Sequence, residues 1–430
     1  MSKGNWARRV AMVLGAAVLL LAPVGPAAPA SAQPEGREHP PIPNRFLVFT
    51  DGNASSRAAV RADVQRRGGQ VADEVRVRPD LDLLAVNVPG AAMADLAGIR
   101  GVREVAPEVP PVQMTHTPTA GEKPDWGVEH IKAPTVWTQG WTGEGIRVAV
   151  VDGGVDLGHP DLAVNGALPP LPHANCSGDA ECKPGGEDGD NDGHGTGVAG
   201  IIAAVKDNNK GTVGVSHKAS ILAVNCFEPG TFFSCLRGVY YAAGLNQNGE
   251  NPTSQPRRAQ VVNMSWGWAE RDLRRCASCI TTIETVMQRA KDRGLVLVAS
   301  AGNTGNTRGT GDSVSYPART GIPIAVAAID RNNRRASWSS TGPQVDLAAP
   351  GVAIESPYKN GAYTTWNGTS AAAPHVAGAA ALVLDKNADL TPDQVRSYLE
   401  NGALDLGSLG TDSHFGKGLV QVDRAVGAVQ

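Results

Sequence analysis

Residues 146–154, Ile-Arg-Val-Ala-Val-Val-Asp-Gly-Gly, decide the fold. From Val148 the apolar residues follow one another without polar ones between them, which is typical of a strand buried on both faces of a parallel sheet. Asp152 and two glycines then end the strand in a sharp turn. Similar apolar stretches follow with helical patterns between them, so we expect an α/β domain with a mainly parallel sheet and helices on both faces. The expected strands are 146–151, 220–224, 260–264, 295–300 and 324–328, and the expected helices are 194–205, 234–245, 280–293, 370–385 and 391–401.

The residues before this sheet predict a small separate domain and an export signal. Residues 45–109 have the order strand, helix, strand, strand, helix, strand, which is a ferredoxin-like α+β pattern. Three basic residues precede an apolar run at 10–22 that is too short to span a bilayer, and small residues at 30–32 follow as a cleavage site. The expected parts are a signal peptide (1–32), a linker with the small domain (33–114) and the sheet domain (115–430).

Composition narrows the kinds of partner. A net charge of -3, from 39 basic and 42 acidic residues, favours neither nucleic acid nor an anionic membrane surface. No apolar stretch after the signal is long enough for a membrane anchor. The 6 cysteines form three close pairs, and export favours disulfides. The pairs are Cys176 with Cys182, Cys226 with Cys235, and Cys276 with Cys279, and the two-residue spacer of the last pair also suits a redox or metal site.

Three polar residues lie at the ends of Gly-rich elements, where ligands bind in α/β sheets. Asp152 ends a strand, and His194 and Ser370 each begin a helix. Each alone has an ordinary explanation as a turn residue, a structural histidine or a helix cap. Together, in the order Asp, His, Ser, they supply a hydroxyl nucleophile, an imidazole base and a carboxylate that orients the base. We therefore expect a catalytic triad.

The sequence around these residues resembles the subtilisin-like serine proteases, the subtilases. The resemblance extends over residues 126–430, and residues 45–109 resemble the inhibitory propeptide that such enzymes carry. It implies a zymogen that is processed near Met114 and has a subtilisin-like fold. One position departs from the archetype, because Gly197 stands where a second histidine is usual. The three similar blocks are Asp152-Gly153-Gly154-Val155-Asp156, His194-Gly195-Thr196-Gly197-Val198-Ala199-Gly200 and Gly368-Thr369-Ser370-Ala371-Ala372-Ala373-Pro374-His375-Val376-Ala377-Gly378.

The resemblance also implies roles for residues near the triad. Asn303 is similar to the residue whose side chain donates to the oxyanion, together with the backbone N–H of Ser370. Ser315 aligns with the floor of the primary specificity pocket, where Gly is common, so we expect a narrower pocket. Tyr316-Pro317 resembles a position with a cis peptide bond. The implied substrate-binding residues are Ser265, Trp266 and Gly267 on one wall, Ser300, Ala301 and Gly302 on the other, and Ser315 at the floor.

No cofactor is expected for catalysis, but the resemblance implies structural calcium. Asp161 and Asn208 match positions that bind calcium in many subtilisins, and hard oxygen ligands suit this ion. Asp188, Asp190 and Asp192 resemble the start of an EF-hand loop, but an alanine holds the position of its last acidic ligand. We therefore expect a solvated acidic loop before His194.

The predicted function is that of a secreted, monomeric serine endopeptidase made as a zymogen, with an acyl-enzyme intermediate. Its expected partners are protein or peptide substrates and its own propeptide. The alternative is a secreted, inactive subtilase-fold binding or scaffold protein, although all four catalytic groups are present. An esterase or lipase of another hydrolase fold would have Gly-x-Ser-x-Gly, which Ser370 lacks. Trp266 and Trp268 are interpreted as subsite walls or core residues, with polysaccharide binding by exposed tryptophans as the alternative.

Overall fold

The computed structural model describes residues 42–108, 123–162, 173–177, 181–185, 190, 192–227, 231–251 and 255–430, which all belong to the compact unit Gly36–Gln430. The predicted signal peptide and the processing point at Met114 lie outside the described residues. Among the residues that are described, no helix has both the length and the apolar character needed to cross a bilayer.

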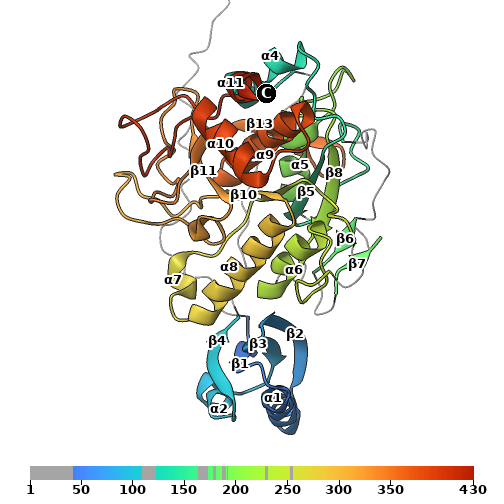
Figure 1. Ribbon diagram of the computed structural model, residues 1–430, viewed down its shortest axis with the longest axis vertical. Coiled ribbons are helices and arrows are strands. Elements are labelled where there is room, and N and C mark those ends of the chain that lie inside the picture. Colours follow the sequence, from blue (N-terminus) through green and yellow to red (C-terminus); the bar gives the residue numbers. More distant parts are fainter. Residues whose placement is uncertain are drawn as a thin grey trace, which may run out of the picture. The chain divides into compact units, whose positions relative to one another are not determined.

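A mainly parallel sheet lies at the centre of residues 123–430 (Figure 1). Its described strands have the order β12-β11-β10-β9-β5-β8-β6-β7, and all neighbours are parallel except β6 and β7. The predicted fold class is thereby confirmed. The strands are β5 (Arg147–Asp152), β6 (Ala174–Asn175), β7 (Lys183–Pro184), β8 (Ser220–Asn225), β9 (Val261–Met264), β10 (Val296–Ser300), β11 (Ile324–Ile329) and β12 (Leu347–Pro350).

Each face of this sheet has its own core, because successive strand residues point to opposite faces. Val148 and Val150 of β5 belong to one core, and Ala149 and Val151 belong to the other. Figure 1 shows α9 and α10 on one side of the sheet and α6 and α8 on the other, and we call these sides the α9 face and the α6 face. Helices α5 (His194–Ala203), α9 (Thr369–Lys386), α10 (Pro392–Gly402) and α11 (Val422–Ala428) pack on the α9 face, and α6 (Phe232–Ala242) and α8 (Ala277–Asp292) on the α6 face.

The central strands and main helices lie within three residues of the predicted bounds. The strand β12 and the hairpin of β13 and β14 were not predicted. β12 ends at Pro350 and β13 contains Pro357, and a proline argues against a strand because it has no N–H to donate. The remaining elements are α3 (Trp126–His130), α4 (Ala133–Trp137), α7 (Glu270–Leu273), the 3-10 helix η1 (Ala318–Thr320), β13 (Ile354–Tyr358) and β14 (Ala362–Trp366).

Residues 42–108 form the predicted α+β arrangement, which we call the N-terminal domain. Its antiparallel sheet has the order β2-β3-β1-β4. Leu84 and Val86 of β3 pack in the core beneath α1 and α2, whereas Leu83 and Ala85 belong to the core of the α6 face. One side of this small sheet therefore continues the core of the larger domain. The elements are β1 (Arg45–Thr50), α1 (Ala54–Arg66), β2 (Gln70–Arg78), β3 (Leu81–Asn87), α2 (Met93–Ala97) and β4 (Val102–Pro107).

All three predicted cysteine pairs form disulfides, which confirms the expected pairing. Five of the cysteines are buried in the core of the α6 face, and Cys182 packs against it. The bridges close short loops, with sequence separations of 6, 9 and 3 residues, so each fixes local structure more than it links distant parts. The bonds are Cys176–Cys182, Cys226–Cys235 and Cys276–Cys279.

Candidate active site

The predicted catalytic residues meet at the carboxyl edge of the parallel strands. Asp152 is the last residue of β5, and Ser265 follows the neighbouring strand β9. His194 is the first residue of α5, and Ser370 is the second residue of α9. Asp152 contacts His194, Ser265 contacts Ser370, and both pairs lie where the neighbouring strands β5 and β9 end, as expected for a parallel α/β sheet.

Asp152 holds the imidazole of His194. The Nδ1 atom of His194 lies 2.7 Å from Oδ1 of Asp152, and both side chains are fully buried. Burial lowers the pKa of His194, but the charge and hydrogen bond of Asp152, with two nearby carboxylates, outweigh it, so the pKa is raised above 6.5. Because Asp152 accepts the proton of Nδ1, the neutral ring presents a basic Nε2 on its other side.

Ser370 lies beside the end of β9, in a reciprocal contact with Ser265. The hydroxyl of Ser370 donates to the Ser265 carbonyl at 3.1 Å, and the hydroxyl of Ser265 donates to the Ser370 carbonyl at 2.9 Å. The buried Nε2 of His194 has no hydrogen-bond partner among the described residues. Such a group is costly unless function requires it, and catalytic hydrogen bonds often tighten only when substrate binds.

Asn303 is oriented by Thr369, the residue before Ser370. Its Oδ1 accepts hydrogen bonds from the backbone N–H of Thr369 at 2.9 Å and from the Thr369 hydroxyl at 3.0 Å. A backbone N–H can only donate, so this contact fixes which end of the planar carboxamide faces Thr369, and Nδ2 points the other way. Ser370 lies in the first turn of α9, where backbone N–H groups have no carbonyl of their own helix to bond. The Asn303 side chain is therefore held beside Thr369, the residue that precedes Ser370.

Ser315 lies between the two predicted walls of the specificity pocket. A Cβ atom added at Gly302 would come within 2.4 Å of Ser315 Oγ, and one added at Gly267 within 3.1 Å of Ser315 Cβ. The Ser315 side chain thus contacts both walls, where a glycine would leave more space. The bond between Tyr316 and Pro317 is cis, as the resemblance implied.

The two tryptophans after β9 are core residues. Trp266 and Trp268 are each 1% exposed, and Trp266 Nε1 donates to the Val151 carbonyl at 2.8 Å. The interpretation as core is confirmed for both, and the alternative of exposed, polysaccharide-binding tryptophans is wrong. A contact of Trp266 with substrate can involve only its backbone. Its neighbours Ser265 and Gly267 have small or no side chains, which leaves that backbone accessible to pairing.

The acidic loop before His194 is a helix cap, and the expectation of a solvated loop is wrong for Asp190. The Asp190 carboxylate is buried and accepts from the backbone N–H groups of Gly193 at 2.9 Å and Thr196 at 2.7 Å. Asp192 accepts from the N–H of His194 at 3.0 Å. Burial, with the charges of Asp152 and Asp192, raises the pKa of Asp190 to about 7. Asp188 lies outside the described residues.

Trp366 packs against the imidazole of His194. Its ring centroid lies 5.3 Å from that of His194 at an interplanar angle of 76°, an edge-to-face arrangement. Gly197, one turn after His194 on α5, makes this possible, because a Cβ there would come within 2.9 Å of the indole. Gly197, which stands where a second histidine is usual in the family, thus leaves the space that the Trp366 indole occupies. Sequence reasoning missed Trp366, although the missing side chain at Gly197 was a signal that something else fills that space.

Asp161 and Asn208, the predicted calcium ligands, lie together. Asn208 Nδ2 donates to Asp161 Oδ1 at 2.6 Å, and the backbone N–H of Thr212 donates to Asp161 Oδ2 at 3.1 Å. Burial raises the pKa of Asp161. Both carboxylate oxygens therefore have protein donors, and the amide nitrogen, not the oxygen, of Asn208 faces the carboxylate. As they lie, these side chains do not fit a cation between them.

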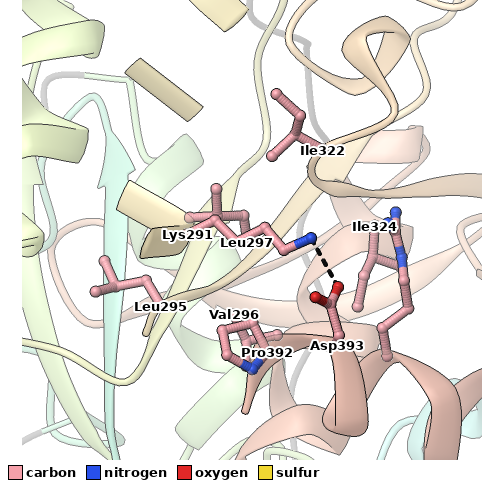
Figure 2. A pocket seen from close by; sticks show the side chains of 9 residues that line it. Lys291, Leu295, Val296, Leu297, Ile322, Ile324, Pro392 and Asp393 are labelled. Atoms are coloured by element: carbon pink, nitrogen blue, oxygen red, sulfur yellow. Dashed lines mark ion pairs between the residues drawn. The ribbon is translucent and has the colours of Figure 1, made fainter. Parts of the chain in front are cut away.

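A separate pocket lies at the opposite edge of the sheet, where β10 and β11 begin (Figure 2). Leu295, Val296 and Leu297 line one side, and Pro392 and Asp393 at the start of α10 line another. An ion pair of 2.7 Å joins Lys291 to Asp393 in the close-up. The lining is mostly aliphatic and includes no serine, histidine or cysteine, so the chemistry described above is not located there.

Comparison with known proteins identifies relatives over most of the chain. Residues 143–418 match the Subtilase family. Subtilisin E of Bacillus subtilis (strain 168) is 36% identical over 403 residues, which cover 92% of this chain and 93% of that protein. The subtilisin of Bacillus pumilus is 39% identical over 303 residues, which cover 70% of this chain and 98% of that protein. The alkaline protease of Alkalihalobacillus alcalophilus is 37% identical over 310 residues, or 71% of each chain.

The fold and these matches define a hydrolase of peptide bonds, a serine endopeptidase. The chain belongs to the subtilase family. Because the match to subtilisin E covers 92% of the chain, the similarity extends into the N-terminal domain. The inactive scaffold has no support among these relatives.

Proposed function

We propose that Asp152, His194 and Ser370 are the catalytic triad of this endopeptidase. Ser370 Oγ attacks the carbonyl carbon of the scissile peptide, and its proton passes to His194 Nε2. The imidazolium returns that proton to the leaving amine as the C–N bond breaks, which leaves an acyl-enzyme. Water then repeats the sequence, with His194 as base, and releases the acid. Asp152 keeps the ring in the required tautomer and stabilises its positive charge.

The Nδ1–Oδ1 hydrogen bond between His194 and Asp152 carries this proposal, together with an Nε2 atom that has no hydrogen-bond partner in the part of the chain that the structure describes. Attack requires the Ser370 hydroxyl to exchange its bond to the Ser265 carbonyl for one to Nε2, which a bound substrate would favour. We propose that Asn303 Nδ2 and the Ser370 backbone N–H hold the oxyanion, because the contact with Thr369 turns Nδ2 away from that residue. The walls and the Ser315 floor would receive the residue before the cleaved bond.

A fluorophosphonate probe tests the triad directly. We expect one label per chain, located at Ser370 by peptide mass spectrometry, and none in Ser370→Ala. Ser408→Ala is the matched control, because this exposed serine lies outside the site and its removal should leave labelling intact. A label on another residue, or casein hydrolysis by purified Ser370→Ala at the parent rate, would overturn the assignment.

We further propose that the protein is a secreted zymogen whose N-terminal domain inhibits the catalytic domain until it is removed. The similarity to subtilisin E extends into this domain, and its sheet shares a core with the α6 face. Intact mass and N-terminal sequencing of the protein from culture medium test both points. We expect loss of residues 1–32 and a second cleavage near Met114, and Ser370→Ala should retain the N-terminal domain. Retention of that domain in fully active parent enzyme would contradict the zymogen.

Structural calcium at Asp161 and Asn208 remains a prediction from resemblance. The pair is already satisfied by protein donors, so a bound ion would need Asn208 to turn its amide oxygen toward the site. Catalysis as proposed includes no step that requires an ion.

A further inference from the structure

An ion pair is buried where the N-terminal domain meets α6. A guanidinium nitrogen of Arg237 on α6 contacts Oδ2 of Asp73 on β2. Only 2% of the Arg237 side chain and 5% of the Asp73 side chain are exposed. Burial, with the nearby charge of Arg45, lowers the pKa of Arg237 to about 10, so the guanidinium stays charged at neutral pH.

A backbone carbonyl of the sheet domain also binds Arg237. Its other terminal nitrogen donates to the Cys176 carbonyl at 3.2 Å. Cys176 is held by its disulfide to Cys182 and by a backbone bond to Asn225 in β8 at 2.7 Å. The guanidinium is therefore anchored to the sheet domain independently of Asp73.

Two further carboxylates of the N-terminal domain bind helix starts on the same face. Glu108 accepts from the Phe232 N–H of α6 at 2.9 Å and pairs with Arg45 at 2.8 Å. Glu104 accepts from the Ser278 N–H of α8 at 3.0 Å. Around Arg237 the N-terminal domain thus contributes Asp73, Glu108 and Arg45, with a net charge of one negative, and the catalytic domain contributes the opposing positive charge.

We propose that the Asp73–Arg237 pair is the electrostatic determinant by which the α6 face recognises its N-terminal domain. The α6 face then accepts as its partner an apolar sheet that places a carboxylate opposite Arg237. This inference rests on the proposed inhibitory role of that domain. A charge buried in a protein–protein contact is tolerated only with its counter-charge, so an N-terminal domain that lacks the carboxylate is rejected. The apolar contacts and the two helix-start carboxylates give affinity, and the ion pair gives selectivity.

The test is a double-mutant cycle in the full-length chain carrying Ser370→Ala, which prevents self-cleavage. The variants are Asp73→Asn, Arg237→Met and both together. Docking is measured by amide hydrogen exchange at Phe232 and Ser278, whose N–H groups bond to carboxylates of the N-terminal domain. Each single variant leaves one buried charge unpaired, so exchange should accelerate by on the order of 100- to 1000-fold. The double variant has no buried charge at either position and should exchange much closer to the parent.

Arg61→Gln is the matched control, because Arg61 pairs with Glu74 inside the N-terminal domain and is 57% exposed. It should leave exchange at both amides unchanged. Single variants that exchange like the parent, or a double variant whose effect is the sum of the two, would overturn the proposal. If a single variant yields no folded chain while the double variant does, the same non-additivity is shown. The assay needs no activity, so failure of fluorophosphonate labelling in the parent would refute the proposed function and leave this result standing.

Discussion

The two faces of the central sheet are stabilised by different means. The α9 face, with the helices that begin at His194 and Ser370, is filled with alanine, valine, leucine and isoleucine, and no cysteine of the described chain belongs to it. The α6 face holds every disulfide and is also covered by the sheet of the N-terminal domain. One face thus carries the helices that begin at the proposed catalytic residues His194 and Ser370, and the other carries the contacts that the proposed processing would remove. The disulfides lie on the face that would lose its cover.

This division predicts that changes at the groups near His194 and Ser370 affect catalysis, whereas changes at the disulfides of the α6 face affect stability. The strongest catalytic change short of removing the triad is Asn303→Ala. We expect kcat to fall by roughly 100- to 1000-fold with little change in KM, the range known for the corresponding asparagine of a subtilisin. Steady-state kinetics on a peptide anilide measure both constants. Thermal unfolding should stay near that of the parent, and a loss confined to KM would mean that Asn303 binds substrate without stabilising the oxyanion.

On the α6 face, removal of the Cys226–Cys235 disulfide by the double change to alanine should affect stability alone. The bridge closes a loop with a separation of 9 residues, which corresponds to roughly 2 to 3 kcal/mol of unfolding free energy from chain entropy. Urea unfolding of the processed enzyme measures the loss. We expect kcat at 25 °C to be unchanged, because the active-site helices α5 and α9 pack on the other face. A large fall in kcat with no change in stability would break the division between the faces.

Within the α9 face, the contact between Trp366 and His194 should be worth a few-fold in rate. Gly197→Ala favours the helix, but its new methyl group conflicts with the indole, so we expect kcat/KM to fall by about 2- to 12-fold, the equivalent of one aromatic contact. Adding Trp366→Phe, which provides room, should restore part of the loss. Trp126→Phe, at a half-buried site away from the triad, serves as the control. If Gly197→Ala lowers kcat/KM equally with and without Trp366→Phe, its effect does not come from the conflict with the Trp366 indole.

The acidic cap should tune the pH dependence of the same face. Asp190→Asn removes a carboxyl group whose negative charge raises the pKa of His194, and because the pKa of Asp190 is itself about 7, this charge is fully present only above that pH. The pKa of the imidazole should then fall, and because the base acts in its neutral form, the acid limb of kcat/KM should move to lower pH. The pH–rate profile between pH 5 and 9 measures this shift, because histidine titrates within that range. Asp192→Asn should move the limb in the same direction, and a limb that moves to higher pH would exclude this electrostatic role.

The positions of the proposed triad residues at the ends of strands and helices could be predicted, because short-range sequence patterns determine where those elements begin and end. Asp152 follows a continuous apolar strand, and His194 and Ser370 begin helices in Gly-rich blocks. The burial of Asp190 could not be predicted, because an acidic run looks the same whether its carboxylates face water or backbone N–H groups. Asp73 and Arg237 lie on separate elements of two domains, and no local pattern indicates which sheet face meets which helix. That information depends on tertiary packing, which periodicity does not record.

The smallest effect is expected from metal removal. Both Asp161 oxygens accept protein hydrogen bonds, so the site is satisfied without an ion. We expect a calcium chelator to change the midpoint of thermal unfolding by less than about 2 °C, which for a domain larger than about 150 residues corresponds to no more than about 1 kcal/mol. The variant Asn208→Asp tests the site more sharply, because it replaces the amide donor with a second carboxylate. That variant should lose stability in chelator and regain it in millimolar calcium, since two carboxylates repel each other without a cation and together suit one. A large chelator effect on the parent would instead mean that the Asn208 oxygen already faces a bound calcium, as the resemblance implied. The stability of the α9 face would then depend on an ion, as that of the α6 face depends on its disulfides.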